Sequence, residues 1–469
     1  MKMKYLKYSY LLVAGALALT SCKKQLDQQP TDLIAEANAF LTFDHVQQGT
    51  NGAYGAYGAY ANDMYVSALL SDEAKLGAGN AGQGALQYRY QFSSDATTGG
   101  VVTAAYNAYY SMIDQINRVL PNISTVTARP EQEARREIVR AQLLALRGIA
   151  HFGLLQAYSK NYNPADPLGV PVMLVSDPLA KPARNTMGEV MAQIEKDLAD
   201  AKAILPAVTA ATFTDTTINR INLAAFQARI ALYKGDYDNA VTFATEVIGS
   251  GIKPLVSGAN FSGIWTDANS NETLFRVRYL TSTAIGGLWT TTGGVIYIAP
   301  SDKLTASYDP ATDIRYSTYI GTTSGGDRYL NKFYNSSRGG RVVDMKVCRI
   351  AEMYLLRAEA NARKASPNLT AASADLNAVR AARITGYVNE TLTTVNDAVT
   401  AILNERFKEL AFEGFRFFDL KRNNLPVSRN ASDASPDWQT LPAGNFRFVM
   451  PIPNSEINAN PNTVQNEGY

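Results

Sequence analysis

The feature that most constrains the fold is a helical hairpin pattern in residues 221–250. Small residues recur three or four positions apart, and so share one face, in each of two stretches: Ala224, Ala228 and Ala231, then Ala240 and Ala244. Gly235 lies between the stretches and allows the chain to reverse sharply. Small side chains let two helix axes approach closely, as in tetratricopeptide-type helix pairs. The chain is therefore predicted to be mainly α-helical.

Further helices are indicated at irregular intervals. Pro130 opens a long apolar-striped helix with acidic residues in its first turn, where the helix dipole favours them. Thr186 and Glu189 form a capping box at the start of another helix. We expect helix pairs at about 102–158, 187–250, 346–383 and 396–422. Because long insertions interrupt the period, we predict an irregular tetratricopeptide-like helical-repeat scaffold.

Two regions have the composition of long loops. Residues 71–100 are rich in Gly, Asn, Gln and Ser, and residues 255–345 are rich in Gly, Thr, Ser and Asn. Short β-rich runs at 274–279 and 294–298 indicate a little sheet in the second region. Long ordered loops in compact proteins are often functional. We therefore expect a loop-rich, slightly β insertion at 255–345 on the ligand side of the scaffold.

The N-terminus has the pattern of a secretory signal. Three lysines precede the apolar run 11–19, which is too short to span a bilayer. The run ends in Leu19-Thr20-Ser21-Cys22, which resembles a bacterial lipobox in which Cys22 is lipidated. The alternative is a plain secretory signal with an incidental cysteine. We expect a signal peptide at 1–21, a lipidated tether at 22–43 and one domain at 44–469.

Composition excludes several classes of function. Lys and Arg total 44 against 42 Asp and Glu, so no electrostatic drive favours nucleic acid. With two His and two Cys, neither a multi-ligand His/Cys metal site nor a disulfide framework can be built. Residues 267–272 carry calcium-like side chains but lack the closing Glu, so we interpret them as a loop. We predict no metal site and no cofactor.

One charged helix near the C-terminus allows two readings. Glu405 and Glu409 lie four apart on one face and could be a glycosidase carboxylate pair. Alternatively, they belong to an ion-pair network, because charges of alternating sign follow every three residues from Glu413 to Arg422. We favour the network, since two carboxylates on one helix leave poor room for a sugar between them.

Several blocks of the chain, in this order, carry a family resemblance: 22–30, 141–158, 195–201, 228–240, 349–360, 376–380, 405–422 and 451–469. Together they resemble the SusD/RagB family of nutrient-binding outer-membrane lipoproteins. The resemblance implies one α-rich domain with four irregular tetratricopeptide-like helix pairs, lipid-anchored in the outer membrane and facing the cell exterior. It also implies that the protein captures a glycan, or less often a peptide, and hands it to a SusC-like TonB-dependent transporter as a hinged lid.

The leading hypothesis is therefore a glycan-binding surface lipoprotein that is not an enzyme. Its implied partners are the SusC-like transporter, the glycan and the outer membrane, and not nucleic acid. One alternative is a secreted carbohydrate-active hydrolase whose Asp/Glu pair converges from separate loops. The other is a tetratricopeptide-type scaffold that binds only protein.

The ligand site is expected on the loops. A sugar ring presents an apolar face and a fringe of hydroxyls, which proteins meet with an exposed aromatic ring and polar side chains at its rim. The candidates are Asn80, Tyr88 and Arg89 in the first loop, and Trp289, Tyr297 and Arg328 in the second. Trp289 is the leading candidate because glycine pairs flank it on both sides and make burial in a helix or strand improbable. The alternative is that Trp289 only pins a loop.

Overall fold

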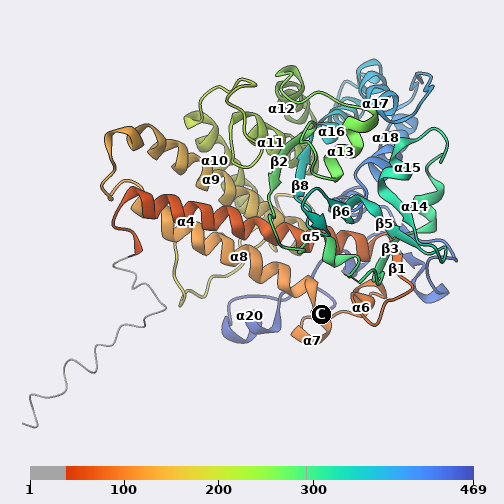
Figure 1. Ribbon diagram of the computed structural model, residues 1–469. Coiled ribbons are helices and arrows are strands. Elements are labelled where there is room, and N and C mark those ends of the chain that lie inside the picture. Colours follow the sequence, from red (N-terminus) through yellow and green to blue (C-terminus); the bar gives the residue numbers. More distant parts are fainter. Residues whose placement is uncertain (1–38, 292) are drawn as a thin grey trace, which may run out of the picture.

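The computed structural model describes residues 39–291 and 293–469. The predicted signal peptide, the lipidation site Cys22 and most of the tether lie outside these described residues. Long helices dominate, with short strands gathered towards one end of the molecule (Figure 1). The prediction of a mainly helical, irregular repeat scaffold is confirmed.

The N-terminal half is a layer of long helices. They are α4 (Phe43–Ala56), α5 (Tyr60–Leu70), α8 (Val101–Val119), α9 (Pro130–Tyr158) and α10 (Met187–Ile204). Helix α9 packs against both α8 and α10. It begins at Pro130 as predicted, and the Thr186–Glu189 capping box opens α10. By length and composition α9 could span a membrane, but 83% of its most apolar window is buried within the protein, as in a core helix.

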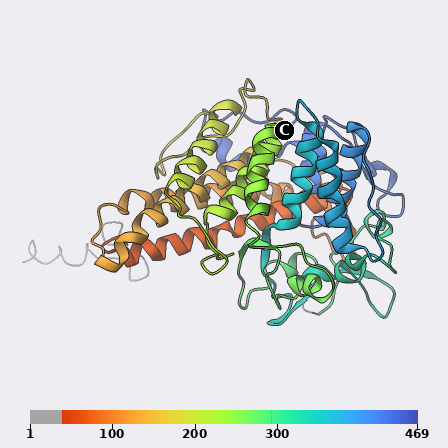
Figure 2. The same cartoon turned by 90° about the horizontal axis from the view of Figure 1, so that it is seen from above.

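The second half contains the clearest hairpins. The helices are α11 (Arg220–Lys234), α12 (Tyr237–Gly249), α16 (Ile350–Arg363), α17 (Leu369–Arg383), α18 (Val395–Glu409) and α19 (Arg416–Arg422). Gly235 ends α11 with φ +82°, the left-handed conformation that glycine adopts without strain. Helix α12 packs on α16, which in turn packs on α17 and α18, so the hairpins form one row across the molecule (Figure 2).

Short elements make up the loop regions. The strands are β1 (Ala74–Leu76), β2 (Thr273–Val277), β3 (Ile298–Pro300), β4 (Ile320–Thr322), β5 (Arg328–Leu330), β6 (Asn335–Ser336), β7 (Gly339–Gly340), β8 (Met345–Arg349), β9 (Val427–Ser428) and β10 (Thr440–Leu441). The short helices are α6 (Ala85–Tyr88), α7 (Ala96–Gly99), α13 (Gly258–Trp265), α14 (Asp302–Ala306), α15 (Ile314–Tyr319) and α20 (Asn454–Ala459). The strands pair antiparallel in twos: β1 with β3, β2 with β8, β4 with β5, β6 with β7 and β9 with β10.

One predicted strand is displaced. The run at 274–279 forms β2, but the run at 294–298 does not form a strand. Gly294 has φ +87°, and the backbone N–H of Thr291 donates to the carbonyl of Val295 at 2.9 Å. The run therefore begins in a turn. Ile296 forms an isolated antiparallel bridge with Thr290, and the paired strand β3 begins only at Ile298.

A buried ionic network fastens the loop insertion to the helices. Arg315 on α15 donates to Glu405 at 2.5 Å and to Glu409 at 3.1 Å, both on α18. Arg349 and Lys332 both bind Glu413 at 2.7 Å. Burial acts to raise the pKa of Glu409, but the charges of the surrounding guanidinium groups outweigh it and hold that pKa well below its ordinary value. The carboxylates are therefore ionised and structural.

This network decides between the two readings of the charged helix. Glu405 is 1% exposed and Glu409 is 0% exposed, and both accept hydrogen bonds from Arg315. A glycosidase pair must face a space that admits a sugar. The prediction of an ion-pair network at these residues is confirmed, although most partners come from other elements than α18 and α19.

Candidate ligand-binding face

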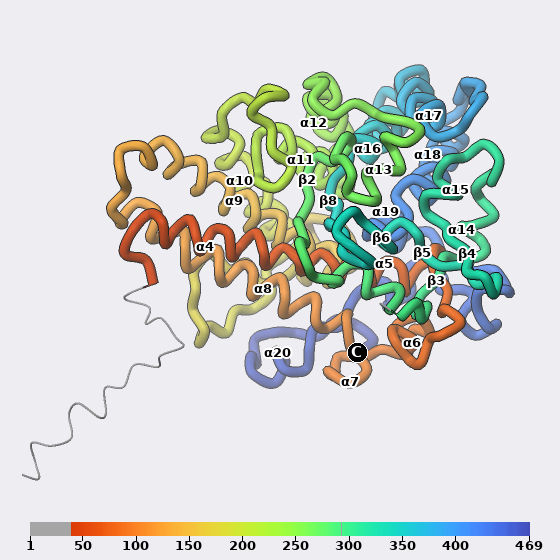
Figure 3. The backbone as a smooth tube through the Cα atoms, viewed as in Figure 1, coloured from red at the N-terminus to blue at the C-terminus, as the bar shows by residue number. Residues whose placement is uncertain are grey.

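The two loop regions meet at one edge of the molecule. Strand β1 from the first region pairs with β3 from the second, in the register Ala74 with Pro300. Beyond the strands, Asn80 donates from Nδ2 to the carbonyl of Tyr297 at 2.9 Å. Figure 3 shows α6 at this end of the molecule, where it contacts β1. The structure thus brings together Asn80 and Tyr297, which come from different loop regions, as a ligand site formed by both regions requires.

A groove of about 410 Å³ lies between these segments. Its lining residues are Lys75, Leu76, Gly77 and Ala78 from the first region, and Ala299, Tyr316, Thr322, Gly326, Asp327 and Arg328 from the second. Of the predicted site residues, Arg328 lines the groove directly. The lining of the groove is mostly polar and includes the half-buried Tyr316.

Asp302 holds the two cations of the groove in place. Its Oδ1 lies 2.7 Å from Nζ of Lys75 and 3.1 Å from a guanidinium nitrogen of Arg328. Burial acts to raise the pKa of Asp302, but the hydrogen bond from Lys75 and the charges of both cations outweigh it, and the pKa lies below its ordinary value. Each cation keeps further N–H donors for a ligand, since Lys has three and Arg five.

An aromatic pair that the sequence analysis did not single out lies in the same insertion. The rings of Tyr329 and Tyr334 are 4.4 Å apart between centroids, and both residues are half-buried. The Arg341 guanidinium lies 4.1 Å from the Tyr334 ring centre. Tyr329 covers Gly321, where a Cβ would come within 2.2 Å of the ring. With 26 tyrosines in the chain, composition gave no reason to choose these two.

The expectation of an exposed platform at Trp289 is wrong. The residue is 1% exposed, and its ring packs against Phe412 at 5.1 Å, Tyr65 at 5.6 Å and Phe333 at 6.3 Å. The flanking Gly286 lies so close to the Arg341 backbone that a Cβ would approach it within 2.6 Å. The glycines therefore permit close packing of the loop, and Trp289 pins that loop to the core.

Tyr88 is also buried, at 2% exposure, which contradicts its role as an exposed platform. Its hydroxyl donates to the carbonyl of Asp433 at 2.7 Å, and the Arg429 guanidinium lies 3.9 Å from its ring centre. Burial raises the pKa of Tyr88 to about 12. The neighbouring Arg89 is half-buried and stacks on Trp438, 4.9 Å from the ring centre. Trp438 comes from the C-terminal region, which the sequence analysis did not connect with this loop.

Comparisons with known proteins identify the family to which the chain belongs. A model described as "SusD family" matches residues 300–469, and a model described as "Starch-binding associating with outer membrane" matches residues 24–232. The chain belongs to the SusD/RagB family. Among SusD-like relatives, protein P2 of Formosa agariphila is 24% identical, over 99% of this chain and all of the relative. Protein P38 of the same organism is 23% identical over 91% of this chain and 93% of the relative.

Solved structures of the SusD/RagB type share the fold. A SusD superfamily protein from Bacteroides thetaiotaomicron superposes with a TM-score of 0.79 at 25% identity, over 91% of this chain and all of that one. A SusD-like carbohydrate binding protein from Bacteroides vulgatus has a TM-score of 0.75 at 21% identity, over 90% of this chain and 98% of that one. A laminarin-binding SusD-like protein has a TM-score of 0.69 at 20% identity, over 92% of this chain and all of that one.

Proposed function

We propose that this protein binds a nutrient glycan and delivers it to a SusC-like TonB-dependent transporter of the outer membrane. The observation that carries the proposal is the groove in which the Tyr316 ring lies near two cations, Lys75 and Arg328. An aromatic face packs on the C–H face of a sugar, and cationic N–H groups donate to its hydroxyls. The membership of the SusD/RagB family supports the same function, because relatives of this fold include carbohydrate-binding proteins.

Binding without cleavage is part of this proposal. The carboxylates that most resemble a glycosidase pair, Glu405 and Glu409, are enclosed in ion pairs with Arg315. Asp302, beside the groove, is likewise engaged by Lys75 and Arg328. A carboxylate whose pKa is lowered by such partners is a poor general acid at neutral pH.

The anchor is proposed to be a lipidated Cys22, with the protein facing the cell exterior. The motif Leu19-Thr20-Ser21-Cys22 supports lipidation, and the description of the matching family model supports association with the outer membrane. The Cys22→Ala variant should move from outer-membrane fractions to soluble ones. Retention on washed membranes at high salt would contradict this anchor. Co-purification of the wild-type protein with a TonB-dependent transporter from detergent-solubilised membranes tests the partner.

The glycan function is tested with the purified mature protein and a panel of oligosaccharides. We expect one class of oligosaccharide to bind, and the mass of the bound oligosaccharide to remain unchanged. Tyr316→Ala should weaken that binding at least tenfold, which corresponds to about 1.4 kcal/mol. Tyr387→Ala is the control, because Tyr387 is also half-buried but hydrogen-bonds Asn377 on α17. Cleavage of the glycan would favour a hydrolase. Neither binding nor cleavage would favour a protein-binding scaffold.

A further inference from the structure

A second cavity, larger than the groove, lies away from it and shares no lining residue with it. Its volume is about 1170 Å³. The walls come from the segment 160–168 that follows α9, the α11–α12 turn, α18, α19 and the C-terminal segments around residues 445 and 466. The volume is slightly above the usual range for ligand pockets in proteins, and it is large enough for several sugar rings.

Lys421 on α19 is the distinctive group of this cavity. Its Nζ donates to the backbone carbonyls of Gln156 at 2.8 Å and Ser159 at 2.5 Å, at the C-terminal end of α9. Within the described part of the chain, no carboxylate lies within 4 Å of this ammonium. Burial lowers the pKa of Lys421 to about 7. A negative charge in the cavity would therefore stabilise its protonated form.

The other cations that line the cavity are already paired with acids in the structure. These pairs are Lys160 with Glu467, Lys234 with Glu195, Arg363 with Glu359, and Arg422 with Glu359 and Asp419. Lys421 thus differs from its neighbours in having only carbonyl acceptors among the described residues. Among the described lining residues, Lys421 is therefore a cation without a carboxylate partner, while the lining carboxylate of Asp166 accepts hydrogen bonds from Asn161 and from the backbone of Leu168.

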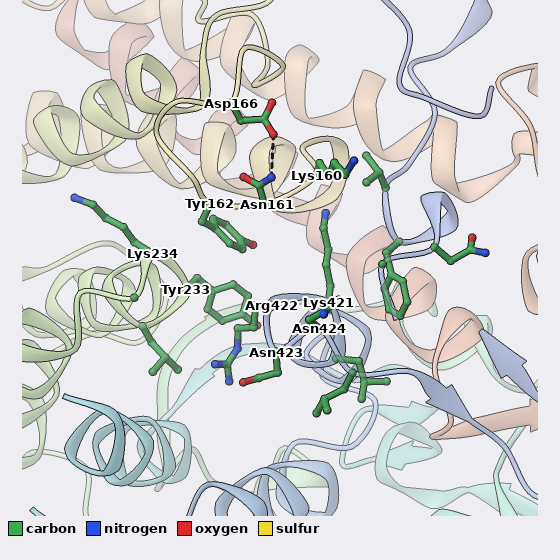
Figure 4. A pocket seen from close by; sticks show the side chains of 18 of the residues that line it. Lys160, Asn161, Tyr162, Asp166, Tyr233, Lys234, Lys421, Arg422, Asn423 and Asn424 are labelled. Atoms are coloured by element: carbon green, nitrogen blue, oxygen red, sulfur yellow. Dashed lines mark hydrogen bonds between the residues drawn. The ribbon is translucent and has the colours of Figure 1, made fainter. Parts of the chain in front are cut away.

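The opposite wall carries two buried hydroxyls. The Oη atoms of Tyr162 and Tyr233 have no hydrogen-bond partner among the described residues. Their rings are 5.9 Å apart and perpendicular, and Tyr233 is 4% exposed. In Figure 4 these two side chains lie across the cavity from Lys421. A buried hydroxyl without a partner costs free energy, so a ligand that supplies one gains affinity.

Amide side chains complete the polar lining. They are Asn161, Asn423, Asn424, Asn445 and Asn466. Asn466, Asn423 and Asn161 already use their amides in hydrogen bonds within the protein. Among the described residues, the amide of Asn424 and Nδ2 of Asn445 have no partner, so they can pair with sugar hydroxyls. The combination of hydroxyl donors, amides and one ammonium without a carboxylate partner specifies a ligand with many hydroxyls and a negative charge.

We propose that this cavity is a second ligand site, which binds a short acidic oligosaccharide with a uronic acid carboxylate at Lys421. The tyrosine hydroxyls and the amides then engage the sugar hydroxyls. The carboxylate replaces the missing acidic partner of Lys421, and the charge-assisted hydrogen bond gives preference over a neutral sugar of the same size. This site and its ligand class are separate from the glycan groove.

Calorimetry on the mature protein with trigalacturonate tests the proposal, and its fully methyl-esterified form is the neutral control. We expect trigalacturonate to bind with an affinity that falls as salt is added, and the ester to bind at least tenfold more weakly. Lys421→Met should remove most of this difference. Lys234→Met is the matched control, because Lys234 lines the same cavity but is paired with Glu195, and it should retain the preference.

Further variants separate the two sites. The double variant Tyr162→Phe/Tyr233→Phe keeps both rings, so it tests the hydroxyls even if Lys421→Met fails to fold, and we expect it to weaken trigalacturonate at least threefold. Tyr316→Ala in the groove should leave trigalacturonate binding unchanged. The proposal is overturned by equal affinity for acid and ester, by loss of binding in Tyr316→Ala alone, or by equally tight binding of triglutamate.

Discussion

Asn80 donates a hydrogen bond from Nδ2 to the carbonyl of Tyr297 at 2.9 Å, although 217 residues separate them in the sequence. The same amide nitrogen donates to the carbonyl of Gln83 at 2.8 Å. One side chain therefore closes its own loop and fastens that loop to the other. Because the β1–β3 pair lies next to this contact, the two loop regions form one structural unit beside the groove.

Replacing Asn80 should loosen this unit. In Asn80→Ala these two hydrogen bonds are lost, together with the one that Oδ1 accepts from the backbone N–H of Gly82. We therefore expect the unfolding free energy to fall by about 1–2 kcal/mol. Amide hydrogen exchange should speed up locally, in residues 76–84 and 295–299. Asn51→Ala is the control, because Asn51 is exposed and only accepts a hydrogen bond from Gln47 on the same helix. Unchanged exchange in both loops of the Asn80 variant would show that strand pairing alone holds them.

Trp289 and Trp438 should respond differently to truncation. Trp289 is fully buried among three aromatic rings, so Trp289→Ala should cost about 3–5 kcal/mol of stability. Trp438 is half-buried, and Trp438→Ala should cost clearly less. Chemical denaturation of both variants checks this order. A Trp289→Ala protein with wild-type stability and lost glycan affinity would restore Trp289 as a ligand platform.

Glu413 should behave as a structural group. It accepts charged hydrogen bonds from Arg349 and Lys332, both 0% exposed in their side chains. Glu413→Ala leaves the buried Lys332 without its carboxylate and removes one of the three carboxylates around Arg349, so it should cost about 3–5 kcal/mol. Glu467 is the control, because its side chain is 85% exposed and pairs loosely with Lys160 at 3.5 Å. We expect Glu467→Ala to change stability by less than about 0.5 kcal/mol. Equal effects of the two variants in urea denaturation would contradict this reading.

The helices were predictable because their signals are local. Pro130 at the start of α9, the capping box at Thr186 and the glycine at the end of α11 act within a few residues, and each is where the sequence places it. For the charged helix, the sequence predicted an ion-pair network but not which residues pair in it. The three-residue spacing that suggested neighbours along the helix corresponds to one real pair, Asp419 with Arg422. Arg416 instead pairs with Asp72.

The candidate site was predictable by region but not by residue. Loop composition pointed to both segments that border the groove, yet nothing local encodes the pairing of β1 with β3. Glycines around Trp289 suggested exposure, whereas exposure depends on which distant backbone packs against them. Here the backbone of Arg341 packs directly against Gly286, where a larger residue would not fit. Tyr316 and Trp438 were missed because an aromatic residue in a short helical turn has no local signal of its final surroundings.

His151 makes a specific contribution to the pH dependence of stability. It is 1% exposed, and its Nε2 accepts the backbone N–H of Met173 at 3.2 Å. Its Nδ1 therefore carries the hydrogen and donates to the carbonyl of Arg147 at 2.9 Å. Both nitrogens are engaged by the neutral ring, and burial lowers the pKa of His151 to about 4.

The direction of this pH dependence follows from the protons that His151 binds in the folded and unfolded states. The unfolded chain protonates this histidine below about pH 6.5, whereas the folded protein does so only below about pH 4. The stabilisation that His151 contributes is fully present above about pH 6.5. It decreases as the pH drops from 6.5 to 4, and it stays constant below that. The total loss is about 3 kcal/mol at 1.36 kcal/mol per pH unit. Asp63 and Glu73, whose pKa values burial raises to about 7 and 8, act in the opposite direction over an overlapping range.

A difference measurement isolates the histidine from those carboxyls. Unfolding free energies of the wild type and His151→Gln are measured in urea from pH 7.5 to 4. Glutamine has no proton to gain, but its amide oxygen can still accept from Met173. We expect the variant to be less stable at pH 7.5, and the gap to close by about 3 kcal/mol as the pH falls to 4, because only the wild type loses this contribution. Parallel curves across the whole range would mean that His151 is protonated equally in the folded and unfolded states.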